Sequence, residues 1–185
     1  YNSAILLDRQ GSIAGVYHKV HPVDTEISQG DGLIPGPVRP PVFETDFGRV
    51  GLSICFDLNY WEVGSGLCAN EAELVVFPET ATTTFVTGLE AEELWNLVDD
   101  VPGRTTRDIQ AAAKSLGVHV VWPSYRRGPE RGTIYNSAIL IGPDGEIIGI
   151  YDKTHPFPLE RRDCGGWVTV GNRADVFETA LGNIG

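Results

Sequence analysis

The stretch GRVGLSICFDLNYWE, residues 48–62, decides how the rest of the chain is interpreted. Arg49–Cys55 is an apolar run of strand-forming residues that follows a turn signal at residues 46–48. The pattern changes after Cys55, where Asp57 and later polar residues favour a turn and a helix start. A cysteine between a buried strand and a helix N-terminus lies where backbone N–H groups and the helix dipole favour a thiolate. Cys55 is therefore a candidate nucleophile, and the alternative is a small apolar residue that ends a core strand.

Composition places the chain among globular proteins and restricts its partners. Of 185 residues, 42% are hydrophobic and 21% are charged, which is ordinary for a domain with a sizeable core. The net charge of −11 argues against nucleic acid and anionic membranes as partners. Apolar runs stay shorter than the ~18 residues of a membrane-spanning helix, and the first residues do not resemble a signal peptide. The three cysteines lack regular spacing, which argues against a disulfide framework, so a cytoplasmic location is expected.

Helix and strand signals alternate early in the chain and form hairpins later, which indicates an α/β layered fold. The clearest helix is expected at residues 105–116, with Thr105 as its N-cap and Gly117 as its stop. Hairpins are expected from residues 1–18 and 135–151. The remaining expected elements are strands at 42–45, 73–77 and 118–122, helices at 59–69 and 89–98, loops at 20–41 and 80–88, and a polar turn at 126–132.

An internal repeat organises the chain. Residues 135–185 match residues 1–51 at a constant spacing of 134 residues. The shared elements are YNSAIL at Tyr1 and Tyr135, YxKxHP around Lys19 and Lys153, and VFET at residues 42–45 and 176–179. Solenoid repeats have periods of ~20–50 residues, so this spacing predicts two related domains or half-domains that meet in one chain.

Three segments resemble motifs of the nitrilase superfamily, the carbon–nitrogen hydrolases. ELVVFPE, ending at Glu79, is similar to the glutamate motif of that family. GEIIGIYDKTHP around Lys153 and SIAGVYHKVHP around Lys19 are similar to its lysine motif, and the stretch around Cys55 is similar to its cysteine motif. The resemblance covers essentially the whole chain and implies the family's αββα sandwich, in partial or permuted form.

The order of the motifs departs from the family, which has glutamate, lysine and cysteine in one domain. Here the order is Lys19, Cys55, Glu79 and Lys153. Residues 1–70 resemble the middle of one domain, and residues 71–185 the first half of another. The chain has no methionine and both ends fall within apolar runs, so we expect a piece of a longer polypeptide. A junction of tandem domains, a permutation and a mis-joined fragment all fit this order.

The resemblance implies hydrolysis of a small linear amide, or of a nitrile, by a Glu-Lys-Cys triad that needs no cofactor. The thiol of Cys55 would attack the carbonyl carbon, and Glu79 would accept the thiol proton. A free thiol has a pKa of ~8.5, so it needs such a base or a positive field at neutral pH. Lys19 or Lys153 would supply the positive charge for the oxyanion, and the sequence does not choose between them.

The resemblance also assigns an auxiliary carboxylate, Glu26 or Glu160, that holds the lysine. No metal is expected, because the histidines at 18, 21, 119 and 155 lack metal-ligand spacing. Cys68 is interpreted as a packing residue and Cys164 as incidental. The competing hypothesis is a non-catalytic remnant that acts as a structural module. Under either hypothesis, apolar strands exposed by a truncated sandwich predict a homo-oligomer.

Overall fold

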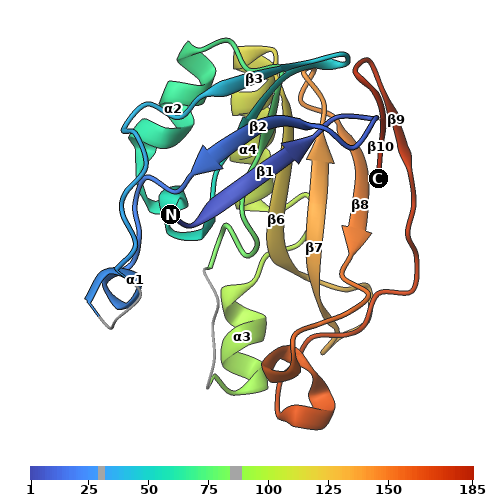
Figure 1. Ribbon diagram of the computed structural model, residues 1–185. Coiled ribbons are helices and arrows are strands. Elements are labelled where there is room, and N and C mark those ends of the chain that lie inside the picture. Colours follow the sequence, from blue (N-terminus) through green and yellow to red (C-terminus); the bar gives the residue numbers. More distant parts are fainter. Residues whose placement is uncertain (29–31, 84–88) are drawn as a thin grey trace. The chain divides into compact units, whose positions relative to one another are not determined.

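The computed structural model describes residues 1–28, 32–83 and 89–185, so part of each expected loop, at 20–41 and at 80–88, lies outside the described residues. The chain divides into two compact units, Tyr1–Pro78 and Glu79–Gly185, whose ribbons are drawn in Figure 1. Each unit is described by itself. In the described part of the chain, no helix has the length and apolar character needed to cross a bilayer.

The first unit begins with the expected hairpin of β1 (Ser3–Leu7) and β2 (Ile13–His18). Side chains of a strand point alternately to its two faces, and the register pairs Ala4 with Tyr17 on the inner face. Tyr17 is fully buried and forms a core cluster with Val20 and Val63. This cluster fixes the hairpin to the remainder of the unit.

Three further strands of the first unit share a sheet in the order β3 (Val42–Thr45), β4 (Gly48–Leu52) and β5 (Leu74–Val76). β3 and β4 are antiparallel, whereas β4 and β5 are parallel. Parallel neighbours need a crossover, and η1 (Cys55–Asn59) and α2 (Trp61–Ala69) supply it. The strand that was expected to reach Cys55 ends at Leu52, so Cys55 begins a 3₁₀ turn instead. The expected loop at 20–41 contains a short helix, α1 (Asp24–Ser28).

The second unit contains the helices α3 (Ala91–Leu97) and α4 (Arg104–Leu116) and an antiparallel meander. The meander consists of β6 (His119–Arg127), β7 (Ile134–Ile141) and β8 (Ile147–Asp152), which lie side by side in Figure 1. Gly117 ends α4 as expected, with the left-handed backbone (φ 67°) that glycine adopts without strain.

Two boundaries of the second unit differ from the sequence expectation. Gly103, not Thr105, is the N-cap of α4, because the Asp99 carboxylate outside the helix accepts the Thr105 N–H at 3.2 Å. β6 continues to Arg127, through the first residues of the expected polar turn, because Arg126 and Arg127 still pair with β7.

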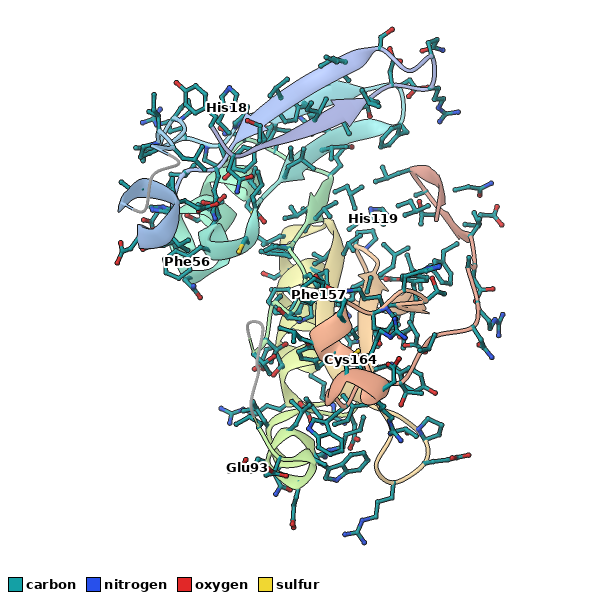
Figure 2. All side chains as sticks on the ribbon, turned by 60° about the horizontal axis from the view of Figure 1, so that its bottom comes forward. His18, Phe56, Glu93, His119, Phe157 and Cys164 are labelled. Atoms are coloured by element: carbon teal, nitrogen blue, oxygen red, sulfur yellow. The ribbon has the colours of Figure 1, made fainter. Side chains whose placement is uncertain are left out.

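The last part of the second unit contains η2 (Pro158–Glu160), η3 (Arg162–Cys164), β9 (Phe177–Thr179) and β10 (Gly182–Ile184). Phe157 and Cys164 mark the segment with the two 3₁₀ turns in Figure 2. The indole N–H of Trp167, just after this segment, donates to the Leu89 carbonyl at 2.9 Å. A core cluster extends from α3 to the residues just after this segment and contains Leu94, Val98, Tyr125, Ile134 and Val168.

The repeat seen in the sequence is also present in the backbone and its close contacts. A Cβ added at Gly15 would lie 2.2 Å from the ring of Phe43, and one added at Gly149 would lie 2.2 Å from the ring of Phe177. These two glycines occupy equivalent positions in the two hairpins, so the same side chain requires the same glycine in each copy.

The spacing of the repeat is not constant, in contrast to the sequence expectation. The Gly36 N–H donates to the Lys19 carbonyl at 2.8 Å, and the Gly171 N–H donates to the Lys153 carbonyl at 2.9 Å. These equivalent glycines are one residue further apart than the lysines. The second copy therefore has one residue more before this glycine, and one fewer after it.

Candidate active site

In the second unit, Lys153 connects two carboxylates. It follows the last residue of β8, and its N–H donates to the Asn136 carbonyl on β7 at 2.8 Å. Its Nζ donates to Glu160 Oε2 at 2.9 Å and also to Glu79 Oε1. The Glu160 side chain is 2% exposed, whereas that of Glu79 is 52% exposed. One carboxylate therefore supports the lysine from inside the unit, and the other is open to solvent.

Glu160 is held by a complete set of donors. Besides Lys153, its oxygens accept the Tyr125 hydroxyl at 2.8 Å, the Asn136 amide at 2.7 Å and the Phe157 N–H at 2.8 Å. Burial favours the neutral acid, but these donors outweigh it and lower the pKa of Glu160. Burial, and next the hydrogen bond to Glu160, raise the pKa of the Tyr125 phenol. Tyr125 therefore remains a donor to a charged carboxylate at neutral pH.

The same carboxylates keep Lys153 charged. Burial opposes the ammonium, but hydrogen bonds to Glu79 and Glu160 outweigh burial, and the pKa of Lys153 is raised. Asn136 links the two acids directly, because its amide also donates to Glu79 Oε1 at 2.7 Å. The result is a fixed ammonium with one exposed carboxylate beside it, which is the arrangement needed to stabilise an oxyanion and move a proton.

The first unit repeats the part of this network in which the lysine contacts the inner carboxylate. Lys19 is 2% exposed and donates to Glu26 Oε2 at 2.7 Å. The Asn2 amide donates to Glu26 Oε1 at 2.7 Å, and the Val23 N–H donates to Glu26 Oε2 at 2.8 Å. The Lys19 N–H donates to the Asn2 carbonyl at 2.8 Å. Each of these contacts has its equivalent at Lys153, and the second network adds Tyr125 and Glu79.

The Glu26 carboxylate predicts how stability depends on pH. The hydrogen bond from Lys19, against a smaller effect of burial, lowers the pKa of Glu26 from 4.5 to about 2. Between these values the unfolded chain binds more protons than the folded chain, so the stabilisation by Glu26 is complete above pH ~4.5 and is lost as the pH falls towards ~2. The difference in melting temperature between the wild type and Glu26→Gln should therefore shrink from pH 6 to pH 2.5. A difference that stays constant over this range would contradict the assignment.

Cys55 occupies a strained position at the first residue of η1. It is exposed, and its φ of 47° lies in the left-handed region that residues with a Cβ rarely adopt. Thr80, which follows Glu79, has a φ of 57°. Such backbone conformations persist only where surrounding contacts enforce them, and they concentrate at functional sites. Figure 2 labels Phe56, the residue after Cys55, on this turn.

The sequence-predicted residues thus fall into two groups. Glu79, Lys153 and Glu160 form one connected network in the second unit. Lys19 and Glu26 form an ion pair in the first unit, which also contains Cys55.

Sequence reasoning missed three polar residues around these lysines: Asn2, Asn136 and Tyr125. A signal for the two asparagines was present, because YNSAIL places an asparagine in an otherwise apolar strand in both copies. A buried amide in a strand needs a partner, and the repeated carboxylate supplies it. Tyr125 gave no such signal. Among the described residues, no group of three or more histidine, cysteine or acidic side chains is placed to hold a metal ion.

Comparison with known proteins identifies the family. The model of the carbon–nitrogen hydrolase family matches residues 1–64 and, separately, residues 62–185. The chain belongs to the carbon–nitrogen hydrolase family, within the nitrilase superfamily that its motifs resemble.

Individual relatives agree with this assignment. Over 161 residues the chain is 27% identical to the N-carbamoylputrescine amidase of Arabidopsis thaliana, with 82% of this chain and 51% of the relative covered. The chain thus spans about half the length of this relative. The carbon–nitrogen hydrolase of Helicobacter pylori G27 has a TM-score of 0.54 at 24% identity, over 82% of this chain and 53% of that one. This likeness confirms the predicted nitrilase-like α/β fold.

The chain is also similar to a solved structure of an amidase mutant from Nesterenkonia sp. AN1. That structure shows the result of Michael addition of acrylamide at the active-site cysteine of the amidase. Its TM-score is 0.51 at 25% identity, with 81% of this chain and 52% of that chain covered.

Proposed function

We propose that this chain belongs to a hydrolase that cleaves the non-peptide carbon–nitrogen bond of a small linear amide, with Cys55 as the nucleophile. A nitrile is the alternative substrate. The observation that carries the proposal is the contact of the Lys153 ammonium with both a buried and an exposed carboxylate. The active-site cysteine of the Nesterenkonia amidase supports the choice of a thiol. The free thiols suit a reducing compartment, which we propose is the cytoplasm.

In the proposed reaction, Glu79 accepts the thiol proton and the Cys55 sulfur attacks the amide carbonyl carbon. The ammonium of Lys19 or Lys153 stabilises the oxyanion of the tetrahedral intermediate. The carbon–nitrogen bond then breaks, Glu79 returns its proton to the leaving ammonia or amine, and a thioester to Cys55 remains. A water molecule that gives a proton to Glu79 attacks the thioester. The acid leaves, and the thiol is restored.

The two copies of the lysine motif support the predicted origin of the chain from two related domains, which we divide at residues 70 and 71. We propose that each copy derives from its own carbon–nitrogen hydrolase domain. Lys19, Glu26 and Asn2 repeat the contacts of Lys153, Glu160 and Asn136, as expected for two related domains. In this scheme Cys55 derives from the first domain and Glu79 from the second.

Alkylation of the three cysteines by iodoacetamide tests the proposed nucleophile. Cys55 should react at least about tenfold faster than the exposed Cys164, because the proposed mechanism assigns Cys55 a base, Glu79, and a lysine ammonium that favour its thiolate. Glu79→Gln should slow the Cys55 reaction about tenfold or more, because an amide does not accept the thiol proton. Mass spectrometry of each labelled peptide over time gives the three rates. Equal slow rates at all three cysteines would contradict a catalytic Cys55.

Such equal rates would favour the second candidate function, a non-catalytic module that self-associates. The observation behind this alternative is an apolar face of the first hairpin, where cross-strand neighbours are exposed. Ile5 is 58% exposed opposite Val16, and Leu7 is 56% exposed opposite Ile13. Association of copies through this face would remove apolar surface from water and produce the predicted homo-oligomer.

A further inference from the structure

Asp57 is fully buried, although it lies only two residues after the exposed Cys55. Its carboxylate accepts the Tyr17 hydroxyl at 2.6 Å, the His21 N–H at 2.8 Å and the Ile54 N–H at 3.1 Å. A buried carboxylate is tolerated only when donors satisfy it, and these donors lie on two segments, one around Lys19 and one at Ile54. The side chain therefore connects segments that are far apart in the sequence.

One of these contacts closes the turn that contains Cys55. The Asp57 carboxylate accepts the Ile54 N–H, and the Asp57 N–H donates to the Ile54 carbonyl at 3.1 Å. The two hydrogen bonds enclose Cys55, whose left-handed φ of 47° is unfavourable for a residue with a Cβ. Both hydrogen bonds stabilise the turn in which Cys55 adopts this backbone conformation.

The other two contacts join this turn to the segment that carries Lys19. Tyr17 and His21 lie two residues before and two residues after Lys19. Tyr17 is fully buried on β2, and burial together with Asp57 raises the pKa of its phenol, so it remains a donor. The His21 ring stacks on Tyr60, which follows η1, at 3.5 Å between centroids. Both sides of the lysine are thus anchored to the cysteine turn.

We propose that Asp57 is a positioning residue that holds the Cys55 turn in its strained, reactive form and fixes it to the Lys19 segment. The part that concerns reactivity depends on the proposed role of Cys55 as nucleophile. The anchoring itself depends only on the contacts of Asp57.

The test uses Asp57→Asn in the full chain, because asparagine keeps the size of the side chain but places an N–H₂ group among donors. The ratio of iodoacetamide alkylation rates at Cys55 and Cys164 should fall about tenfold or more, and amide exchange at Ile54 and His21 should accelerate. If the wild-type ratio is well above one and Asp57→Asn leaves it unchanged, the inference about Asp57 is overturned, whereas the role of Cys55 as nucleophile is supported. A wild-type ratio near one would instead overturn the role of Cys55 as nucleophile. The anchoring by Asp57 is then tested by amide exchange alone: faster exchange in Asp57→Asn supports it, and unchanged exchange overturns it.

Two tyrosine variants keep the test informative if Asp57→Asn does not fold. Tyr17→Phe removes one donor to Asp57 and should lower the alkylation ratio in the same direction, by less. The matched control is Tyr151→Phe, at the equivalent position of the repeat, where the hydroxyl pairs with Thr154 at 3.1 Å and not with an aspartate. Tyr151→Phe should leave the ratio unchanged. Equal effects of the two tyrosine variants would overturn the assignment to Asp57.

Discussion

Replacing Cys55 with alanine is expected to lower the release of ammonia from small linear amides by at least about 10³-fold, to the background rate. Without the sulfur no thioester forms, and water would have to attack the unactivated amide directly. The exposed position of Cys55 on a strained turn gives a substrate access to the thiol. This is the largest effect on activity that the proposed mechanism predicts.

The measurement is an ammonia-release screen over small amides, carbamoyl amines and nitriles. Carbamoyl amines are included because one relative is an N-carbamoylputrescine amidase. The matched control is Cys164→Ala, which removes another exposed thiol, on η3, and should leave the rate unchanged. Ammonia release that survives Cys55→Ala would exclude the thioester mechanism. Comparison of the three substrate classes then identifies the bond that is cleaved.

Local sequence patterns were sufficient for most of the fold. The strand-like runs at residues 1–7 and 12–18, with turn residues between them, predicted the first hairpin, and Tyr17 falls on its buried face. The apolar positions of residues 105–116 and the glycine at 117 predicted α4. These predictions succeeded because periodicity and turn residues act over a few positions. The start of α4 was wrong because a side chain outside the helix, Asp99, holds its first turn.

Of the candidate site, the sequence predicted only the residues that belong to the family motifs. The lysines and Glu79 were identified from the motifs, and the family resemblance added Glu26 and Glu160. The polar partners of these residues were not identified, because they lie far away along the chain: Asn136 is 57 residues from Glu79, and Tyr125 is 35 residues from Glu160. Such pairs leave no local pattern. The sequence predicted Asp57 only as a turn former, because Tyr17, which donates to its carboxylate, lies 40 residues away.

Replacing Glu160 with leucine is expected to lower the free energy of unfolding of the second unit by about 3 to 5 kcal/mol. Glu160 is 4% exposed, so its loss leaves the Tyr125 hydroxyl, the Asn136 amide and the Phe157 N–H without their acceptor. Each buried donor left unsatisfied costs about 1–3 kcal/mol. Lys153 would still have Glu79 as its ion-pair partner, so the loss of unfolding free energy should not exceed this range.

The matched control is Glu79→Leu, which removes the other carboxylate on the same lysine. The Glu79 side chain is 52% exposed, and water can replace it, so the loss should stay below about 1 kcal/mol. Urea unfolding followed by circular dichroism, with amide exchange read over residues 79–185, separates the two variants. Equal losses would contradict the division of roles. If Glu79 contributes little to folding and yet controls the alkylation of Cys55, its role is chemical. The role of Glu160 is then structural, because its carboxylate holds the lysine.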